Sequence, residues 1–173
     1  MRLSFVLTGA VVAAAAVALS AQKMEKPGIT NYTKVDAVVA CGGSTETSAL
    51  EGLKNDGFKA VINLREASEA GANIEENAAK AKALGLNYIH IPFNGQSPQT
   101  KTVDDFLAAV SNKANQPVYI HCASANRVGG VWAIKRVVQD GWSREAALAE
   151  GHAIGLESPV IVDFVHRFLD SRG

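Results

Sequence analysis

The chain has no excess of charge of either sign, because 17 lysines and arginines balance 17 aspartates and glutamates over its 173 residues. This balance excludes a polybasic protein that binds nucleic acid or a membrane surface through charge alone. Cysteine is also scarce, with only two residues, so a small scaffold held together by several disulfides is excluded. We therefore expect no nucleic-acid partner.

The common short motifs for metals and nucleotides are missing as well. The sequence contains neither HExxH nor paired CxxC motifs, and its four histidines are scattered. The glycine-rich loops GxxxxGK[ST] and GxGxxG, which bind nucleotide phosphates, are absent. The sequence therefore predicts no metal site and no cofactor.

A long apolar run occurs only at the N-terminus. Arg2 is the only charge among the first 21 residues, an apolar run covers 6–19, and small residues surround Ala21. This order is typical of a secretory signal, and roughly 14 apolar residues are too few to span a bilayer as a helix. We predict that residues 1–21 are a signal peptide and that the mature protein, 22–173, is periplasmic or secreted without stable membrane insertion. Retention of the segment as a membrane anchor is the alternative.

The mature chain has the size of one domain, with no internal repeat and no linker. Short β-branched runs predict strands, and longer capped segments between them predict helices. This alternation predicts an α/β fold, a three-layer domain with a mainly parallel central sheet of four to five strands. Residues 22–28 look loose. The expected strands cover 35–40, 59–64, 87–93 and 117–121, and the expected helices cover 45–56, 73–84, 102–114, 127–140, 143–154 and 159–170.

The most informative stretch lies between the fourth strand and its following helix. Its small residues allow several backbone N–H groups to converge on one anion, and the helix adds its positive end. Arg127 supplies a planar fork of donors for an oxyanion, and Cys122 is expected to be a reactive thiolate with a pKa lowered from about 8.5. The alternative is an inert cysteine in the core. The stretch consists of His121, Cys122, Ala123, Ser124, Ala125, Asn126 and Arg127.

This stretch resembles the phosphate-binding loop of the cysteine-dependent tyrosine and dual-specificity phosphatases. The resemblance extends through VACGGSTETSALEGLKNDGFKAVINLRE, GLNYIHIPF and QPVYIHCASANR, in the order found in bacterial phosphatase-like domains, including those of β-lactamase-hydrolase-like proteins. It implies a phosphatase-like fold and hydrolysis of a phosphorylated protein or small phosphoester. In that family the cysteine attacks phosphorus, the arginine binds the phosphoryl oxygens and a separate aspartate protonates the leaving oxygen.

Three positions depart from the family pattern. Four residues separate Cys122 from Arg127, whereas the tyrosine phosphatases have five, and Val128 replaces a usual serine or threonine. Asn94 stands where the acidic aspartate is expected, and an amide cannot act as an acid. The short loop also resembles that of rhodanese-type sulfurtransferases. Two alternatives therefore remain open: a sulfurtransferase with a persulfide on Cys122, and a phosphate-binding or anion-binding module without catalysis.

Other polar residues are expected near this loop. Glu66 and Glu69 follow the second strand and could reach the site, and Arg65 is their expected partner or a second anion contact. His121 is expected to hold the loop through backbone hydrogen bonds. In the resembling fold, Cys41 ends a strand beside that of Cys122, so a reversible disulfide between them is a hypothesis, with a buried unpaired thiol as its alternative.

Overall fold

The computed structural model describes residues 21–172, so the expected signal peptide lies outside the described residues except for Ala21. A six-stranded sheet forms the centre, in the order β1-β2-β3-β6-β4-β5. The four central strands are parallel, and β1 and β2 continue the sheet in antiparallel pairing. The strands are β1 Gln22–Lys23, β2 Thr33–Lys34, β3 Val39–Gly42, β4 Ala60–Asn63, β5 Asn87–His90 and β6 Val118–His121.

The predicted α/β fold with a mainly parallel sheet is confirmed, but the expected four to five strands and the loose segment at 22–28 are wrong. β1 and β2 are two residues long and polar, so they carry no alternating pattern that a sequence reading could detect. They exist because β3 offers them a free edge, where Thr33 pairs with Cys41.

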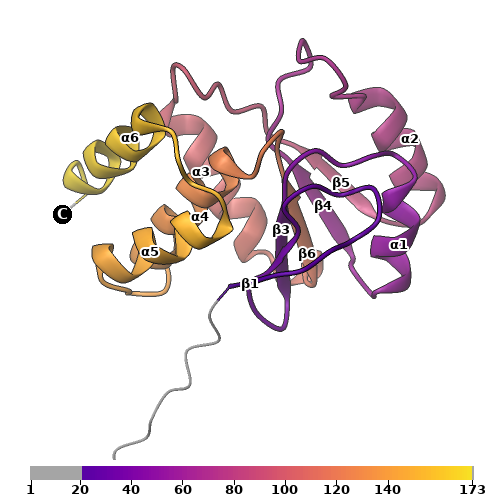
Figure 1. The fold of residues 1–173 in the computed structure, drawn as a ribbon, viewed down its shortest axis with the longest axis horizontal. Helices are drawn as coiled ribbons and strands as arrows, with labels where there is room; N and C mark the ends of the chain where they lie inside the picture. The colour runs from indigo at the N-terminus through magenta and orange to yellow at the C-terminus, as the bar shows by residue number, and fades with distance from the viewer. Residues whose placement is uncertain (1–20, 173) are drawn as a thin grey trace, which may run out of the picture.

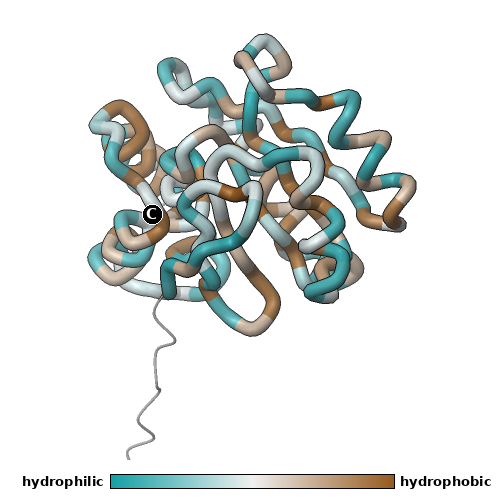
Figure 2. The backbone as a smooth tube through the Cα atoms, turned by 45° about the vertical axis from the view of Figure 1, so that its right-hand side comes forward, coloured by the Kyte–Doolittle hydropathy of each residue, from teal (hydrophilic) through white to brown (hydrophobic). Residues whose placement is uncertain are grey.

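Two layers of helices enclose the sheet (Figure 1). Helices α1 and α2 cover one face, and α3 to α6 cover the other. In Figure 2 the outer helices alternate between hydrophilic and hydrophobic residues, as expected for elements buried on one side. No helix within residues 21–172 has the length and apolar character needed to cross a membrane. The helices are α1 Ala49–Asn55, α2 Ile74–Ala83, α3 Thr100–Ser111, α4 Asn126–Val138, α5 Arg144–Ile154 and α6 Pro159–Asp170, with a 3₁₀ turn at Lys113–Asn115.

Side-chain alternation along β6 divides the core between the two faces. Ile120 and Cys122 belong to the cluster under α3 to α6, and Tyr119 belongs to the cluster under α1 and α2. Because side chains alternate along a strand, His121 shares the face of Tyr119, and the two rings stack 5.6 Å apart.

Helix α1 begins four residues later than the sequence predicts. Thr45 does not cap it; instead its hydroxyl donates to the Gly43 carbonyl and lies 2.8 Å from the Tyr119 hydroxyl. Asn73, where the next helix is expected to begin, does not cap α2 either, since this residue adopts a left-handed conformation and its side chain makes no capping bond. Both residues favour turns, where local side-chain hydrogen bonds compete with helix formation.

Helices α4 and α5 approach each other closely at glycine. A Cβ atom on Gly129 would clash with the Gly151 carbonyl and would lie 2.9 Å from the Leu156 nitrogen. We expect Gly129→Ala to lower the free energy of unfolding by about 1–3 kcal/mol through overpacking. The matched control is Gly52→Ala in α1, where the nearest atom would be 3.8 Å away and about 0.5–1 kcal/mol should be gained. Urea unfolding measures both, and equal effects would contradict this packing.

Candidate active site

The loop between β6 and α4 lies at the carboxyl end of the parallel strands, where the sequence predicts the ligand site. It fits between two glycines. A Cβ atom added to Gly43 would lie 3.0 Å from the Ala123 carbonyl oxygen, and one added to Gly155 would lie 3.1 Å from the Ala125 Cβ. Asn31 supports the loop from the side, because its amide donates to the Ser124 carbonyl at 3.2 Å. The chain therefore has little freedom to change the shape of this loop.

The loop and the first turn of α4 present several backbone donors to the site. The N–H groups of residues 123–128 donate no hydrogen bond to any other residue in the described part of the chain. Ala125 has a φ of 72°, so a left-handed residue directly precedes the right-handed first turn of α4. Such a change of hand makes successive N–H groups face one concavity, which binds anions. The positive end of α4 adds to this preference for negative charge.

Cys122 lies at the base of this loop and is fully buried. Its backbone N–H donates to the Gly42 carbonyl at 3.3 Å. Burial works to lower the pKa of Arg127, but the hydrogen bonds and charge of Glu69, with a contribution from Cys122, raise it above its usual value.

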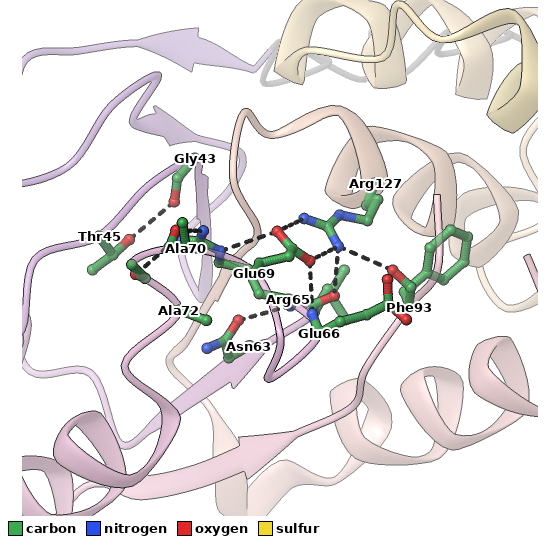
Figure 3. Close-up of polar contacts among 12 residues, drawn as sticks. Gly43, Thr45, Asn63, Arg65, Glu66, Glu69, Ala70, Ala72, Phe93 and Arg127 are labelled. Carbon is green, nitrogen blue, oxygen red and sulfur yellow. Dashed lines mark hydrogen bonds and ion pairs between the residues drawn. The ribbon is translucent and has the colours of Figure 1, made fainter. Parts of the chain in front are cut away.

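The Arg127 guanidinium is held from one end (Figure 3). Its Nη1 donates to Glu69 Oε1 at 2.5 Å and to the Phe93 carbonyl at 3.0 Å, and its Nη2 donates to Glu69 Oε2 at 2.8 Å. A guanidinium has five N–H donors. The bonds to Glu69 leave the Nε–H and one Nη2–H, which share the other edge and form a second fork suited to an oxyanion.

Glu69 fixes this orientation because it is itself held by several donors. Arg65 Nε donates to its Oε2 at 3.2 Å and the Glu66 N–H donates to its Oε1 at 2.7 Å. Burial works to raise the pKa of Glu69, but the hydrogen bonds from Arg127 and Glu66 and the Arg127 charge lower it to about 2. Glu69 is therefore a carboxylate at neutral pH and holds no proton to donate.

Arg65 binds the backbone of its own loop. Its Nη1 and Nη2 donate to the carbonyls of Gly71 and Ala70, at 2.9 and 2.6 Å, so its donors are used to hold the loop that carries Glu69. In the structure it is a partner of Glu69, which is one of the two roles that the sequence leaves open.

Asn94 lies on the rim of a cavity of about 350 Å³ beside Arg127. Its Oδ1 accepts from the N–H groups of Gln96 and Ser97, both at 2.9 Å, and its Nδ2 donates to Glu66 Oε1 at 3.2 Å. A larger cavity, of about 450 Å³, opens at the opposite end of the sheet and contains none of the predicted site residues. The rim of the smaller cavity is formed by Glu66, Glu69, Asn94, Gly95, Gln96, Asn126, Arg127, Ser158 and Ile161.

Asn126 and His121 differ from what the sequence leads us to expect. Asn126 Oδ1 accepts from the N–H groups of Glu157 and Ser158, so its side chain holds the start of α6. The buried Nδ1 of His121 makes no hydrogen bond to another residue of the described chain, so this atom does not hold the loop. Burial lowers the pKa of His121 to about 4, although the backbone of Cys122 and Gly43 acts in the opposite direction.

The disulfide between Cys41 and Cys122 is not formed, and both residues are buried free thiols. Cys41 lies opposite Ile120 in the sheet, two residues before Cys122. Along a strand this offset alone amounts to about 6.6 Å, before the spacing between strands is added, which is unfavourable for a disulfide. Burial and the charge of Glu150 raise the pKa of Cys41 well above its usual value.

Several residues that shape the site carry no signal in the sequence. Asn31 precedes the sheet's main strands, and Ser158 and Ile161 belong to the last helix and its start. Their positions depend on tertiary packing, which no local pattern reveals. Within residues 21–172, no cluster of three or more histidine, cysteine, aspartate or glutamate side chains is arranged to hold a metal ion.

Comparison with protein families decides the relationship. The profile of the family described as "DSP-PTPase phosphatase fused to NAD+ Kinase" matches residues 12–161. The chain belongs to this family. The resemblance to cysteine-dependent tyrosine and dual-specificity phosphatases is thereby confirmed.

Individual relatives agree. The β-lactamase hydrolase-like protein of Xylella fastidiosa strain 9a5c is 26% identical over 133 residues, which are 75% of this chain and 30% of the relative. The chain thus spans about a third of that protein. The fold matches a DUF442 protein from Shewanella putrefaciens CN-32, with a TM-score of 0.73 and 20% identity over 84% of this chain and 95% of the other. It also matches TpbA from P. aeruginosa, with a TM-score of 0.69 and 20% identity over 88% and 91%.

The contacts of Glu69 predict a pH-dependent stability. Because its pKa falls from 4.5 to about 2 on folding, its stabilising effect is complete above pH 4.5 and disappears as the pH falls through 2. We expect Glu69→Gln to lower the free energy of unfolding by about 1–3 kcal/mol at pH 7, and by clearly less near pH 2.5. Urea unfolding at both pH values measures this, with the exposed Glu76→Gln as control. A difference that is equal at both pH values would contradict the ionised contact.

Proposed function

We propose that this protein hydrolyses a phosphoester by covalent catalysis, with Cys122 as nucleophile and Arg127 as the anion-binding side chain. Membership of a phosphatase family supports the reaction class. The observation that carries the residue assignment is that Glu69 holds one edge of Arg127, which leaves the other N–H donors of Arg127 free at the cavity that it lines, in the same loop as Cys122. One phosphoryl group can then accept from Arg127 and from the loop N–H groups together.

The chemistry follows from the charges around the loop. The N–H groups of residues 123–128, the positive end of α4 and Arg127 all stabilise negative charge, and they would stabilise both the thiolate and the equatorial phosphoryl oxygens. The thiolate attacks phosphorus, the ester oxygen leaves, and water then hydrolyses the phosphocysteine. Because Cys122 is fully buried, the phosphoryl group must enter the loop before the sulfur can reach it.

Relatives suggest the class of substrate. TpbA from P. aeruginosa has been described in complex with pTyr. For the present chain we propose a phosphorylated protein or a small phosphoester as the partner, since the cavity is open to solvent beside Arg127.

Sulfur transfer is a second candidate, and the length of the loop is the observation that favours it. Four residues separate Cys122 from Arg127, and Asn94 replaces the expected acid. A persulfide on Cys122 needs no acid to protonate an ester oxygen. A third possibility, anion binding without turnover, would use the same N–H groups.

One set of variants separates these candidates. We expect Cys122→Ser to abolish phosphate release from an aryl phosphate, and Arg127→Lys to lower kcat/KM by about 10²- to 10³-fold, because an ammonium has no fork. Cys41→Ser is the control and should retain activity, since Cys41 lies within β3 and outside the loop of residues 121–127. Mass analysis of the intact protein identifies the adduct on Cys122. Thiocyanate formation from thiosulfate and cyanide would favour sulfur transfer, and phosphate binding that survives Cys122→Ser without either activity would favour a binding module.

We further propose that the protein is exported and begins at Gln22 after cleavage. β1 starts at this residue, so cleavage after Ala21 would leave every described strand intact. Expression in a bacterial host with sequencing of the N-terminus tests this: we expect the mature protein in the periplasm or medium, starting at Gln22. Recovery of the uncleaved chain in the membrane fraction would instead support an anchor.

A further inference from the structure

The proposed reaction lacks an assigned acid to protonate the leaving oxygen. Three of the acidic residues that follow the strands or begin a helix nearby are already engaged. Glu69 is ionised and bound to Arg127. Asp104 pairs with Arg172, and Asp105 pairs with Lys101, and neither lines the cavity beside Arg127.

Glu66 differs from all three. It is the only other carboxylate on the rim of the cavity that contains Arg127, and it is partly buried. Its Oε1 accepts from Asn94 Nδ2 at 3.2 Å, and it forms no ion pair with another residue of the described chain. One carboxyl oxygen is therefore held in place, while the other, Oε2, makes no hydrogen bond to a residue within 21–172.

The orientation of Asn94 supports this arrangement. Its Oδ1 is fixed by the N–H groups of Gln96 and Ser97, so its NH₂ group must point towards Glu66. Asn94 occupies the position where an aspartate acid is expected from the sequence. The structure thus brings a carboxylate from the loop after β4 to the amide in the loop after β5.

We propose that Glu66 is the general acid of this phosphatase, positioned by Asn94; the assignment rests on the proposed function. As the Cys122 sulfur forms its bond to phosphorus, the ester P–O bond breaks, and its electron pair takes the proton from Glu66 Oε2. Glu66 is then a carboxylate. In the second step it accepts a proton from water, whose oxygen attacks phosphorus while the S–P electron pair returns to Cys122, and inorganic phosphate leaves.

An acid matters most when the leaving oxygen is a strong base. Glu66→Gln keeps the size of the side chain and can still accept from Asn94, but it has no acidic proton. We expect kcat/KM for phenyl phosphate to fall about 10²- to 10⁴-fold, and kcat/KM for 2,4-dinitrophenyl phosphate to fall by no more than a few-fold. In the wild-type protein, kcat/KM for phenyl phosphate should fall as rising pH removes the proton of the acid. In Glu66→Gln this dependence on pH should be weaker.

The matched control is Glu157→Gln. Glu157 directly precedes Ser158 on the rim but does not itself line the cavity, so this change removes one nearby negative charge without removing the proposed acid. We expect this variant to change kcat/KM only slightly, and by the same factor for both esters.

Each outcome decides the assignment. A selective loss on phenyl phosphate in Glu66→Gln alone supports it. Equal effects on the two esters, no effect on either, or the same selective loss in Glu157→Gln would overturn it while leaving the phosphatase function intact. If the wild-type protein shows no Cys122-dependent cleavage of even the dinitrophenyl ester, the proposed function itself fails, and the acid with it.

Discussion

The bidentate contact between Glu69 and Arg127 is the constraint on which the rest of the site depends. A free guanidinium on α4 would have many orientations, and a flexible side chain must lose this freedom whenever it binds an anion. Here the loss occurs during folding, because Glu69, the Phe93 carbonyl and the Leu64 carbonyl fix one end of Arg127. The same contact commits Glu69 to the ionised state and removes it from proton transfer. Glu69 therefore orients Arg127 and does not act as the acid.

Because of this contact, the loops after β4 and β5 have different roles in the site. The loop after β4 supplies Glu69 to orient Arg127 and places Glu66 at the cavity, and the loop after β5 supplies Asn94 to hold Glu66. In a parallel sheet such loops meet at one edge whatever their separation in sequence. Arg65, although charged and close by, serves this arrangement by binding the carbonyls of Ala70 and Gly71.

The sequence predicts the parts of this protein that local patterns control. The four parallel strands and the helices between them follow from apolar runs and their breaks, and the loop at residues 121–127 is recognisable because small residues, cysteine and arginine occur together before a helix. β1 and β2 escape detection, since two polar residues form a strand only when a neighbouring edge is available. The start of α1 is misplaced because Thr45 bonds to Gly43 and Tyr119 instead. The sequence does not reveal whether Glu66 or Glu69 contacts Arg127, because this depends on side-chain geometry and not on spacing.

The C-terminal helices influence the site although they supply neither the nucleophile nor the anion-binding arginine. They act through contacts at Asn126 and Gly155. Asn126 is bonded to the backbone at the start of α6, and Gly155, after α5, packs against Ala125. The position of the loop N–H groups is consequently fixed in part by how the last two helices dock. Related proteins could adjust their preference among oxyanions of different size by repacking these helices, while every residue that touches the anion stays the same.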